Sequence, residues 1–360
     1  MRKNSPFTLL ENGSAILSAE HELYRQLRLA IPVIDAAIYK IIRLTGGFRV
    51  SCSDSRLDRE LESFVKNVRT DAGSVSLQSF IDSYFEQLLC YGTAVGEMLT
   101  DADGRVVYLY NAPLDTIAVR RKQDDFRQVL ICRNDMLKPV PVRNQQRLLY
   151  STLNADAGEL TGNSVMKGLP FVSSVLYKIF NAVGANWERV GNVRFAVTYK
   201  PDSELSSKAY AKERAMQIAE EWGNAMKSNE VRDFIAVGDV DIKVIGADNQ
   251  ILDSEVPVRQ IMEQIVSKLS LPPFMLGLSW STTERMSQQQ ADALTTELEH
   301  YRRILTPVIE KICSYHLRAF GYTRGVEVVW DDITLKDTLD EANAAYLNAK
   351  TQQILKGGEA

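Results

Sequence analysis

Cysteine and histidine are scarce in this sequence, with four and three copies among 360 residues. The cysteines are scattered along the chain at Cys52, Cys90, Cys132 and Cys313. No two of them form a CxxC pair, so the spacing argues against a structural zinc site. We therefore expect buried free thiols in a reducing compartment.

The histidines give no sign of a metal or catalytic centre either. His300 and His316 fall sixteen residues apart on one predicted helix, about 24 Å along its axis, too far to share one ligand. Together with His21 they are predicted to be ordinary surface or core residues.

Long apolar runs are also absent. No stretch approaches the roughly 18 apolar residues that a membrane span needs. The N-terminus opens with Arg2 and Lys3, but polar residues and Pro6 interrupt the apolar region that a signal peptide requires. We expect assembly in the cytoplasm and no membrane partner.

Positive charge is not in excess. The net charge is −4, and the pI is about 5.6. A protein that grips nucleic acid tightly is usually basic, at least in its binding domain. The chain is therefore not expected to be a high-affinity generic DNA binder.

Common catalytic and nucleotide-binding motifs are missing, including GxGxxG, GxSxG and HExxH. Gly162 and Gly168 have roughly the spacing of a phosphate-binding loop, but no Lys-Ser/Thr pair follows Gly168. We expect no cofactor and no enzymatic activity.

Two acidic clusters keep an enzymatic alternative open. Asp101 and Asp103 precede Gly104, which favours a hairpin turn over a calcium loop. Asp331 and Asp332 follow a predicted strand, which favours a strand-end turn over a metal-binding carboxylate pair. A metal-dependent enzyme would use these four aspartates.

The first 160 residues have the pattern of an α+β unit, with helices first and an antiparallel sheet after. Apolar residues recur at helical spacing from Ala19 to about Leu44, where Pro32 is expected to split the helix. A second helix is expected to end near Gly92, and β-rich runs follow it.

The rest of the chain is mainly helical. Long helices are predicted from about Leu169 to Val190, from Ser254 to Leu269 and from Thr283 to Phe320. An α/β insert of about 55 residues separates the first two, with strands meeting at Gly238-Asp239. The strand "VEVVW" and a last helix, from about Thr338 to Leu355, follow.

The stretch "LSLPPFMLGLSW" separates two of these helices. Pro272 and Pro273 remove backbone donors and disfavour helix at Leu271, so the preceding helix should end there. Gly277 then permits a reversal of the chain.

The order of these elements resembles that of a tailed-bacteriophage portal protein. Three stretches carry the resemblance: "GTAVGEMLTDADGRVVYLYNAPLDTIAV", "GNSVMKGLPFVSSVLYKIFNAVGANWERVGN" and "IVSKLSLPPFMLGLSWSTTERMSQQQADALTTELEHYRRILTPVIEKI". The last contains the "LPPxxLG" element, with "LTP" some thirty residues on. The loop after Gly277 departs from the family pattern, because Ser281, Thr282 and Thr283 replace the Tyr and Asn often found there.

The resemblance implies a predominantly helical α+β fold with seven regions. These are a wing (1–165), a first stem helix (166–192), a clip (193–250), a second stem helix (251–270), a tunnel-loop region (271–285), a long helix with a wing strand (286–334) and a short crown (335–360).

The resemblance also implies a function and partners. Portal proteins form rings, usually of twelve subunits, at one capsid vertex, and double-stranded DNA passes through them during packaging and ejection. The major capsid protein, the terminase and head-completion or adaptor proteins would be partners. A monomeric scaffold that binds partners through the long helix is a further alternative.

Two groups of residues would then carry function. The tunnel loop next to DNA would contain Trp280, Ser281, Thr282, Thr283, Glu284 and Arg285, preceded by the helix-break element Leu271, Pro272, Pro273 and Gly277. Trp280 would be either a packing anchor or a residue near the DNA path. The terminase-facing clip would present Lys208, Lys212, Glu213, Arg214 and Asp239. Mixed charge in this insert favours a solvated or subunit-facing helix over a phosphate groove.

Overall fold

The computed structural model describes residues 13–122, 125, 128–134, 139–191, 194–199, 211–227, 240–245, 254–278 and 284–333. The chain divides into two compact units. One comprises Met1–Ser174 and Gln260–Ala360, and the other comprises Val175–Arg259. No helix in the described part of the chain has the length and apolarity needed to cross a bilayer.

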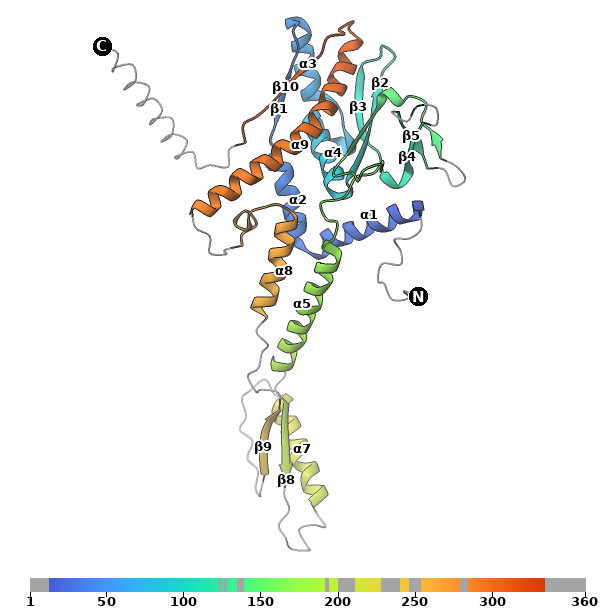
Figure 1. The fold of residues 1–360 in the computed structure, drawn as a ribbon. Coiled ribbons are helices and arrows are strands. Elements are labelled where there is room, and N and C mark those ends of the chain that lie inside the picture. The colour runs from blue at the N-terminus through green and yellow to red at the C-terminus, as the bar shows by residue number, and fades with distance from the viewer. Residues whose placement is uncertain are drawn as a thin grey trace, which may run out of the picture. The chain divides into compact units, whose positions relative to one another are not determined.

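The first unit begins with four helices (Figure 1). They are α1 (Gly13–Ala30), α2 (Pro32–Thr45), α3 (Ser55–Asn67) and α4 (Leu77–Tyr91). The predicted split at Pro32 is confirmed, because Pro32 opens α2 and Ile31 is its extended N-cap. The half-buried Arg28 side chain fixes this corner, donating to Asp35 Oδ1 at 2.8 Å and to Glu86 Oε1 at 2.7 Å.

Helix α3 was not predicted from the sequence. Its pattern is dominated by charged residues, and only Leu61 and Phe64 are buried. The helix starts at Asp54, whose carboxylate accepts hydrogen bonds from the Arg56 and Leu57 N–H groups. Capping and two apolar anchors therefore define this helix more than hydrophobic periodicity does.

The predicted antiparallel strands after α4 are confirmed. The strands β2 (Thr93–Thr100), β3 (Val106–Asn111) and β7 (Leu148–Thr152) form one sheet in the order β3-β2-β7. A smaller sheet contains β4 (Ile117–Arg121), β5 (Val129–Arg133) and β6 (Val140–Pro141). Val95, Ala112, Ile131 and Leu148 form a buried cluster drawn from both sheets.

The Asp101–Gly104 segment is the hairpin turn expected from the sequence. The Asp101 side chain accepts the Arg105 N–H at 2.8 Å, and its carbonyl accepts the Gly104 N–H at 3.2 Å. Gly104 has a φ of +84°, which an L-residue rarely adopts. The turn joins β2 to β3.

The long helix α9 (Glu284–Arg318) crosses the first unit (Figure 1). It contacts α2, α3 and α4 as well as the sheet strands β3 and β7. After α9, β10 (Glu327–Trp330) pairs antiparallel with β1 (Phe48–Ser51), the strand that follows α2.

Arg302 holds α9 to both neighbouring segments. Its guanidinium donates to the Thr45 carbonyl at 2.9 and 2.7 Å and to the Asp331 carbonyl at 2.7 Å. It also lies 5.2 Å from the centroid of the Trp330 ring. The Thr45 carbonyl belongs to the last turn of α2, where backbone acceptors lack helical partners. One buried cation therefore caps α2 and fixes β10.

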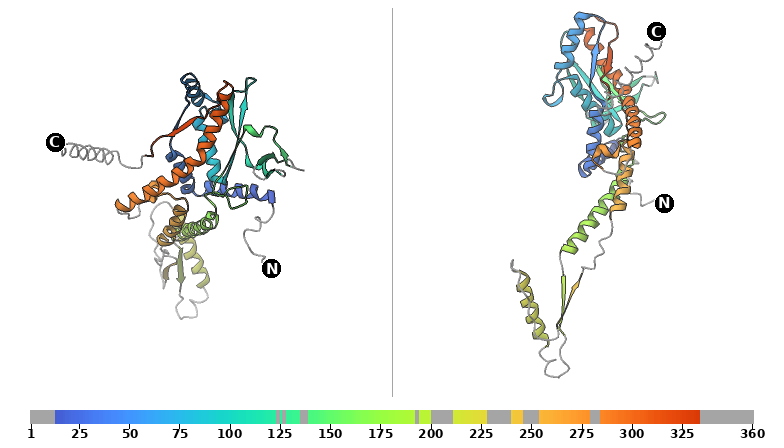
Figure 2. Two further views of the ribbon diagram at one scale, coloured as in Figure 1. Left: turned by 45° about the horizontal axis from the view of Figure 1, so that its top comes forward. Right: turned by 90° about the vertical axis from the view of Figure 1, so that its left-hand side faces the viewer.

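The second unit contains a two-stranded sheet and a helix (Figure 2). β8 (Arg194–Tyr199) pairs antiparallel with β9 (Val240–Ile245), and α7 (Ala211–Lys227) contacts β8. Two helices run across the division between the units: α5 (Leu169–Gly191) and α8 (Glu255–Lys268). The strand predicted before Gly238 and the last predicted helix lie outside the described residues.

The four thiols are free, as expected. Cys90, Cys132 and Cys313 are buried, but Cys52 is only half-buried. Cys52 follows β1 in a short exposed connection, where its Sγ lies 3.4 Å from the Asp54 carbonyl. The prediction of a buried thiol is therefore wrong for Cys52.

His316 is a core residue, with 4% of its surface exposed. Its ring stacks on Phe64 at 3.9 Å between centroids and lies 5.5 Å from the Phe320 ring. Neither ring nitrogen makes a well-formed hydrogen bond, although the Val106 backbone lies nearby. Burial lowers the pKa of His316, which favours the neutral imidazole.

His316→Phe is expected to reduce the loss of stability on mild acidification. The folded state binds the His316 proton less readily than the unfolded state, whose histidines have a pKa near about 6.5. The contribution of neutral His316 to the free energy of unfolding is therefore fully present above the unfolded-state pKa. It is lost as the pH falls below that pKa toward the lowered pKa of the folded state. Urea unfolding at pH 7.5 and 5.5 would measure this change; an equal loss in the variant and the unsubstituted protein would contradict it. His21 keeps some pH dependence, because burial lowers its pKa as well.

Candidate functional site

The junction between α8 and α9 contains the predicted helix-break element. The Leu269 N–H still bonds to the Ile265 and Val266 carbonyls, but Ser270 then adopts a φ of +54°. Helix α8 therefore ends just before the prolines. Pro272 is extended, with φ −59° and ψ 135°, and the segment Pro273–Leu276 makes a single 3-10 turn. The predicted break is confirmed.

Gly277 ends that turn as predicted. It has a φ of +75°, and its N–H bonds to the Phe274 carbonyl at 3.2 Å. The Leu278 N–H bonds to the Pro273 carbonyl at 3.1 Å, which closes the turn. Glycine takes this left-handed conformation without the steric cost that a Cβ atom brings.

Buried side chains fix the break to the first unit. Leu269 and Leu271, on either side of the Ser270 bend, are both buried beside Ile265 and Val266 of α8. The 3-10 turn contacts α2. Among the apolar residues of this turn, Phe274 is exposed, at 45%. The break is therefore anchored in the core but offers an aromatic side chain to the surface.

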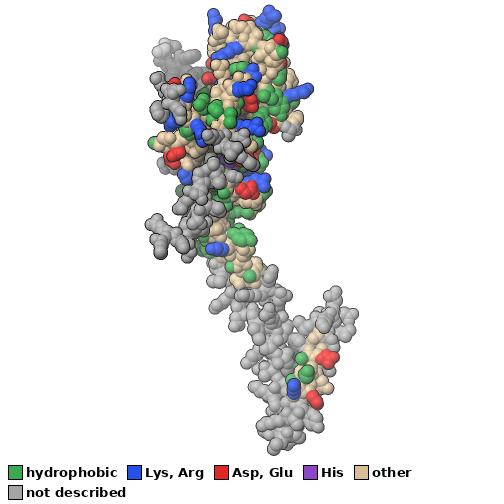
Figure 3. Space-filling view, turned by 90° about the vertical axis from the view of Figure 1, so that its right-hand side faces the viewer, with side chains coloured by type: hydrophobic (Ala, Val, Ile, Leu, Met, Phe, Trp, Pro, Cys, Tyr) green, Lys and Arg blue, Asp and Glu red, His purple; other side chains and the backbone are tan. Residues whose placement is uncertain are grey.

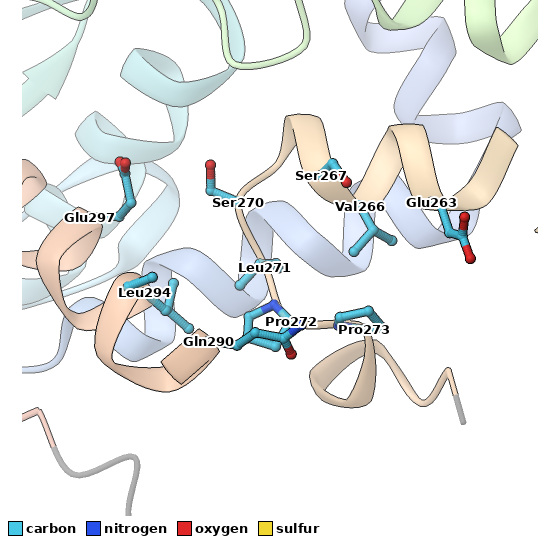
Figure 4. Close-up of a pocket in the computed structure, with 11 residues that line it drawn as sticks. Glu263, Val266, Ser267, Ser270, Leu271, Pro272, Pro273, Gln290, Leu294 and Glu297 are labelled. Atoms are coloured by element: carbon cyan, nitrogen blue, oxygen red, sulfur yellow. The ribbon is translucent and has the colours of Figure 1, made fainter. Parts of the chain in front are cut away.

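A groove of about 500 Å³ lies along this junction (Figure 4). Its apolar lining includes Val266, Leu271 and Leu294, and Glu263 and Glu297 supply carboxylates. Among the described residues, no basic side chain lines it. The groove is thus apolar and acidic, which suits protein packing better than contact with a phosphate backbone.

Gln290 adds a buried acceptor to the same groove. Its Oε1 atom is buried without a hydrogen-bond partner. Sequence reasoning missed Glu263, Gln290 and Glu297, because their separation along the chain gives no local motif. Only the folded α8–α9 junction brings them to one groove.

The predicted tunnel-loop residues are only partly described. Trp280, Ser281, Thr282 and Thr283 lie outside the described residues. Glu284 and Arg285 form the start of α9. The predicted clip residues Lys208 and Asp239 also lie outside, whereas Lys212 and Glu213 are exposed in the first turn of α7, where Arg214 also stands.

Two of the four aspartates of the enzymatic alternative, Asp101 and Asp331, make contacts that stabilise the fold. Asp101 closes the β2–β3 turn, in which Asp103 also lies. Asp331 follows β10, where its N–H bonds to the Gly47 carbonyl and its carboxylate lies 3.8 Å from Arg49. In the described part of the chain, no three His, Cys, Asp or Glu side chains are grouped to hold a metal ion.

The glycine run that resembles a phosphate loop serves close packing. A Cβ on Gly162 would lie 2.0 Å from the Gly92 carbonyl oxygen and 2.3 Å from that of Leu153. The Gly162 N–H donates to Thr93 Oγ1 at 3.0 Å, and the Asn163 N–H donates to the Leu153 carbonyl at 2.8 Å. Three backbone segments therefore cross at Gly162.

Charges are mixed on the outer surface as well. Figure 3 shows Lys and Arg side chains interspersed with Asp and Glu over the visible face of the first unit. No large area of that face carries one sign of charge. A surface of mixed charge attracts a phosphate backbone less strongly than a uniformly basic one.

Comparison with known proteins places the fold. No protein-family model matches the sequence, and no curated protein matches it. A subunit of the neck of an empty gene transfer agent (GTA) particle, computed with C6 symmetry, aligns at 15% identity over 90% of this chain and 88% of that chain, with a TM-score of 0.64. A subunit of the neck of the native GTA particle, computed with C12 symmetry, aligns at 15% identity over 91% and 88%, with a TM-score of 0.59. An HK97-family phage portal protein from Corynebacterium diphtheriae aligns at 13% identity over 85% and 95%, with a TM-score of 0.44.

The GTA neck structures define the class of fold. The chain has the α+β, predominantly helical fold of these neck subunits, and the match extends over nearly its whole length. The α+β, predominantly helical fold class expected from the sequence is confirmed.

Proposed function

We propose that this chain is a portal subunit, which forms a ring at one capsid vertex of a virus or virus-like particle. The observation that carries the proposal is the fold match over about nine-tenths of the chain to subunits of an assembled GTA neck. A head-to-tail contact between identical subunits closes into a ring when the rotation between them fits. One of those necks was computed with C12 symmetry, which supports a ring of twelve.

The regions of the chain have distinct roles in this proposal. The α+β part forms the wing, and α5 and α8 are the stem helices. The second unit includes the clip, which docks the terminase and later the head-completion or adaptor proteins. Residues 335–360 belong to the crown in this proposal.

Double-stranded DNA passes through the ring during packaging and ejection. The segment from Trp280 to Arg285 borders this path. The net charge of −4 supports a conduit, because a dense array of Lys and Arg would release counterions and hold DNA strongly. The ring belongs to the virion, contacts the major capsid protein and needs no membrane or cofactor.

Catalysis is not part of the proposal. The Asp101 carboxylate closes a hairpin turn, and the main chain of Asp331 joins the β1–β10 pair. These placements favour structural roles for both acidic clusters over a metal-dependent active site. A monomeric scaffold remains the other alternative, and subunit counting separates it from a portal.

Native mass spectrometry and negative-stain microscopy of the purified chain test the proposal. We expect closed rings with an open centre and a mass of about twelve subunits. A strictly monomeric chain at high protein concentration would contradict the portal proposal. A stable complex with one partner and no ring would instead support the scaffold alternative.

A further inference from the structure

Helix α5 carries a row of exposed aromatic side chains. Tyr177, Phe180 and Trp187 are 65%, 53% and 60% exposed. Their spacings of three and seven residues place them on one face of the helix. Gly184 lies on the same face, and a Cβ there would meet no atom within 4 Å. We refer to Tyr177, Phe180, Gly184 and Trp187 as the aromatic face.

The rest of α5 has few charged side chains, which a solvent-exposed helix usually carries. Between Leu169 and Trp187 the only charged residue is Lys178, whereas the shorter helix α3 has six charged residues. A surface helix normally has one polar and charged face, and a helix without one is buried in its functional state. The exposed aromatic face therefore indicates a missing partner.

A second face of α5 has complementary shape. Ser174, Ala182 and Ala185 are small and exposed, and the exposed Lys178 lies among them. Phe171, which is 63% exposed, stands in the same row but about 9 Å before Tyr177 along the axis, outside the level of the aromatic face. At about 100° per residue, this small face lies roughly 140° around the helix from the aromatic face. Between Ser174 and Trp187, helix α5 thus has large side chains on one side and small side chains nearly opposite them.

A ring requires this kind of asymmetry. Each subunit uses one surface toward the next copy and a different surface toward the previous one. With twelve copies, successive subunits turn by about 30°, so the two contact faces of a helix along the ring axis are about 150° apart. The angle between the two faces of α5 agrees with this geometry.

We propose that the aromatic face of α5 packs against the small face of α5 in the next copy of the chain. The inference rests on the proposed ring and names the surfaces that join its subunits. Large rings fit beside Ser174, Ala182 and Ala185, because these residues let the helix backbones approach closely. Lys178 of one copy lies against the aromatic rings of its neighbour, an arrangement favoured by the cation–π attraction.

Paired cysteine substitutions test the contact. Phe180→Cys and Ala182→Cys stand on different faces of one helix, so their side chains point apart within a subunit. Between neighbouring copies they face each other. After mild oxidation, the double variant is expected to give a ladder of covalent oligomers on a non-reducing gel, extending to the full ring. Each single variant is the matched control and is expected to give no ladder.

The outcomes separate this inference from the proposed function. Rings by microscopy together with a ladder only in the double variant support both. Rings without a ladder overturn the α5 contact and leave the portal proposal standing. A covalent dimer in either single variant overturns the head-to-tail arrangement, because one introduced cysteine per subunit can form only one disulfide and therefore joins like faces. Monomers in every variant and in the unsubstituted chain overturn both.

Discussion

Gly162→Ala is expected to destabilise the first unit by about 3 kcal/mol or more, among the largest effects of any single methyl group in this chain. The added Cβ would lie 2.0 Å from the Gly92 oxygen and 2.3 Å from the Leu153 oxygen. Both obstructing atoms belong to backbone, so no side chain can rotate away. The substitution must instead separate the end of β7 from the α4–β2 connection.

The matched control is Gly325→Ala. A Cβ there would meet nothing within 4 Å, and Gly325 has no positive φ. We expect a change within about 0.5 kcal/mol for this control. Urea unfolding followed by circular dichroism measures both variants. Similar midpoints for Gly162→Ala and the unsubstituted chain would show that the three segments do not cross tightly.

Arg302→Met is expected to cost about 3 kcal/mol, because it leaves the buried Thr45 carbonyl and the part-buried Asp331 carbonyl without their Arg302 donors. The Thr45 carbonyl loses both of its donors from Arg302, and the Asp331 carbonyl loses one. The Trp330 ring also loses the cation beside it. Arg302→Lys should recover only part of the loss, since an ammonium group lacks the planar fork of donors.

The neighbouring Arg303 provides the control for Arg302. It stands on the same helix but is exposed, so Arg303→Met should change stability by no more than about 0.5 kcal/mol. Thermal and urea unfolding measure the stability of each variant, after circular dichroism has shown that the folded variants have equal helix content. An equal small loss at both positions would mean that Arg302 does not fix α2 and β10.

Local sequence signals predicted the regular elements well where the physics is local. Pro32 split the first helices, and Gly277 took the left-handed conformation that ends the turn after Pro273. A proline ring or a missing Cβ acts on its own residue and its immediate neighbours, so these effects need no tertiary information. The predicted Asp101–Gly104 hairpin turn was also local.

Other features were beyond local reasoning. Helix α3 lacks a wide apolar stripe, and it is stabilised by the Asp54 cap and by the burial of Leu61 and Phe64. The spacing of Gly162 and Gly168 resembled a phosphate loop, but the distances around Gly162 show a backbone crossing. Nothing near Arg302 in the sequence indicates that its partners are Thr45 and Asp331.

By itself, the sequence determined the class of fold, the order of the long helices and the place of the break between α8 and α9. These follow from periodicity, proline and glycine, which act over a few residues. Only the tertiary structure decided which residues are buried against other segments and which side chains stay exposed to solvent. Backbone segments pack tightly around Gly162, and Arg302 bonds to distant carbonyl groups, whereas the aromatic face of α5 stays exposed. Sequence alone does not show this, because burial depends on residues brought together from distant parts of the chain.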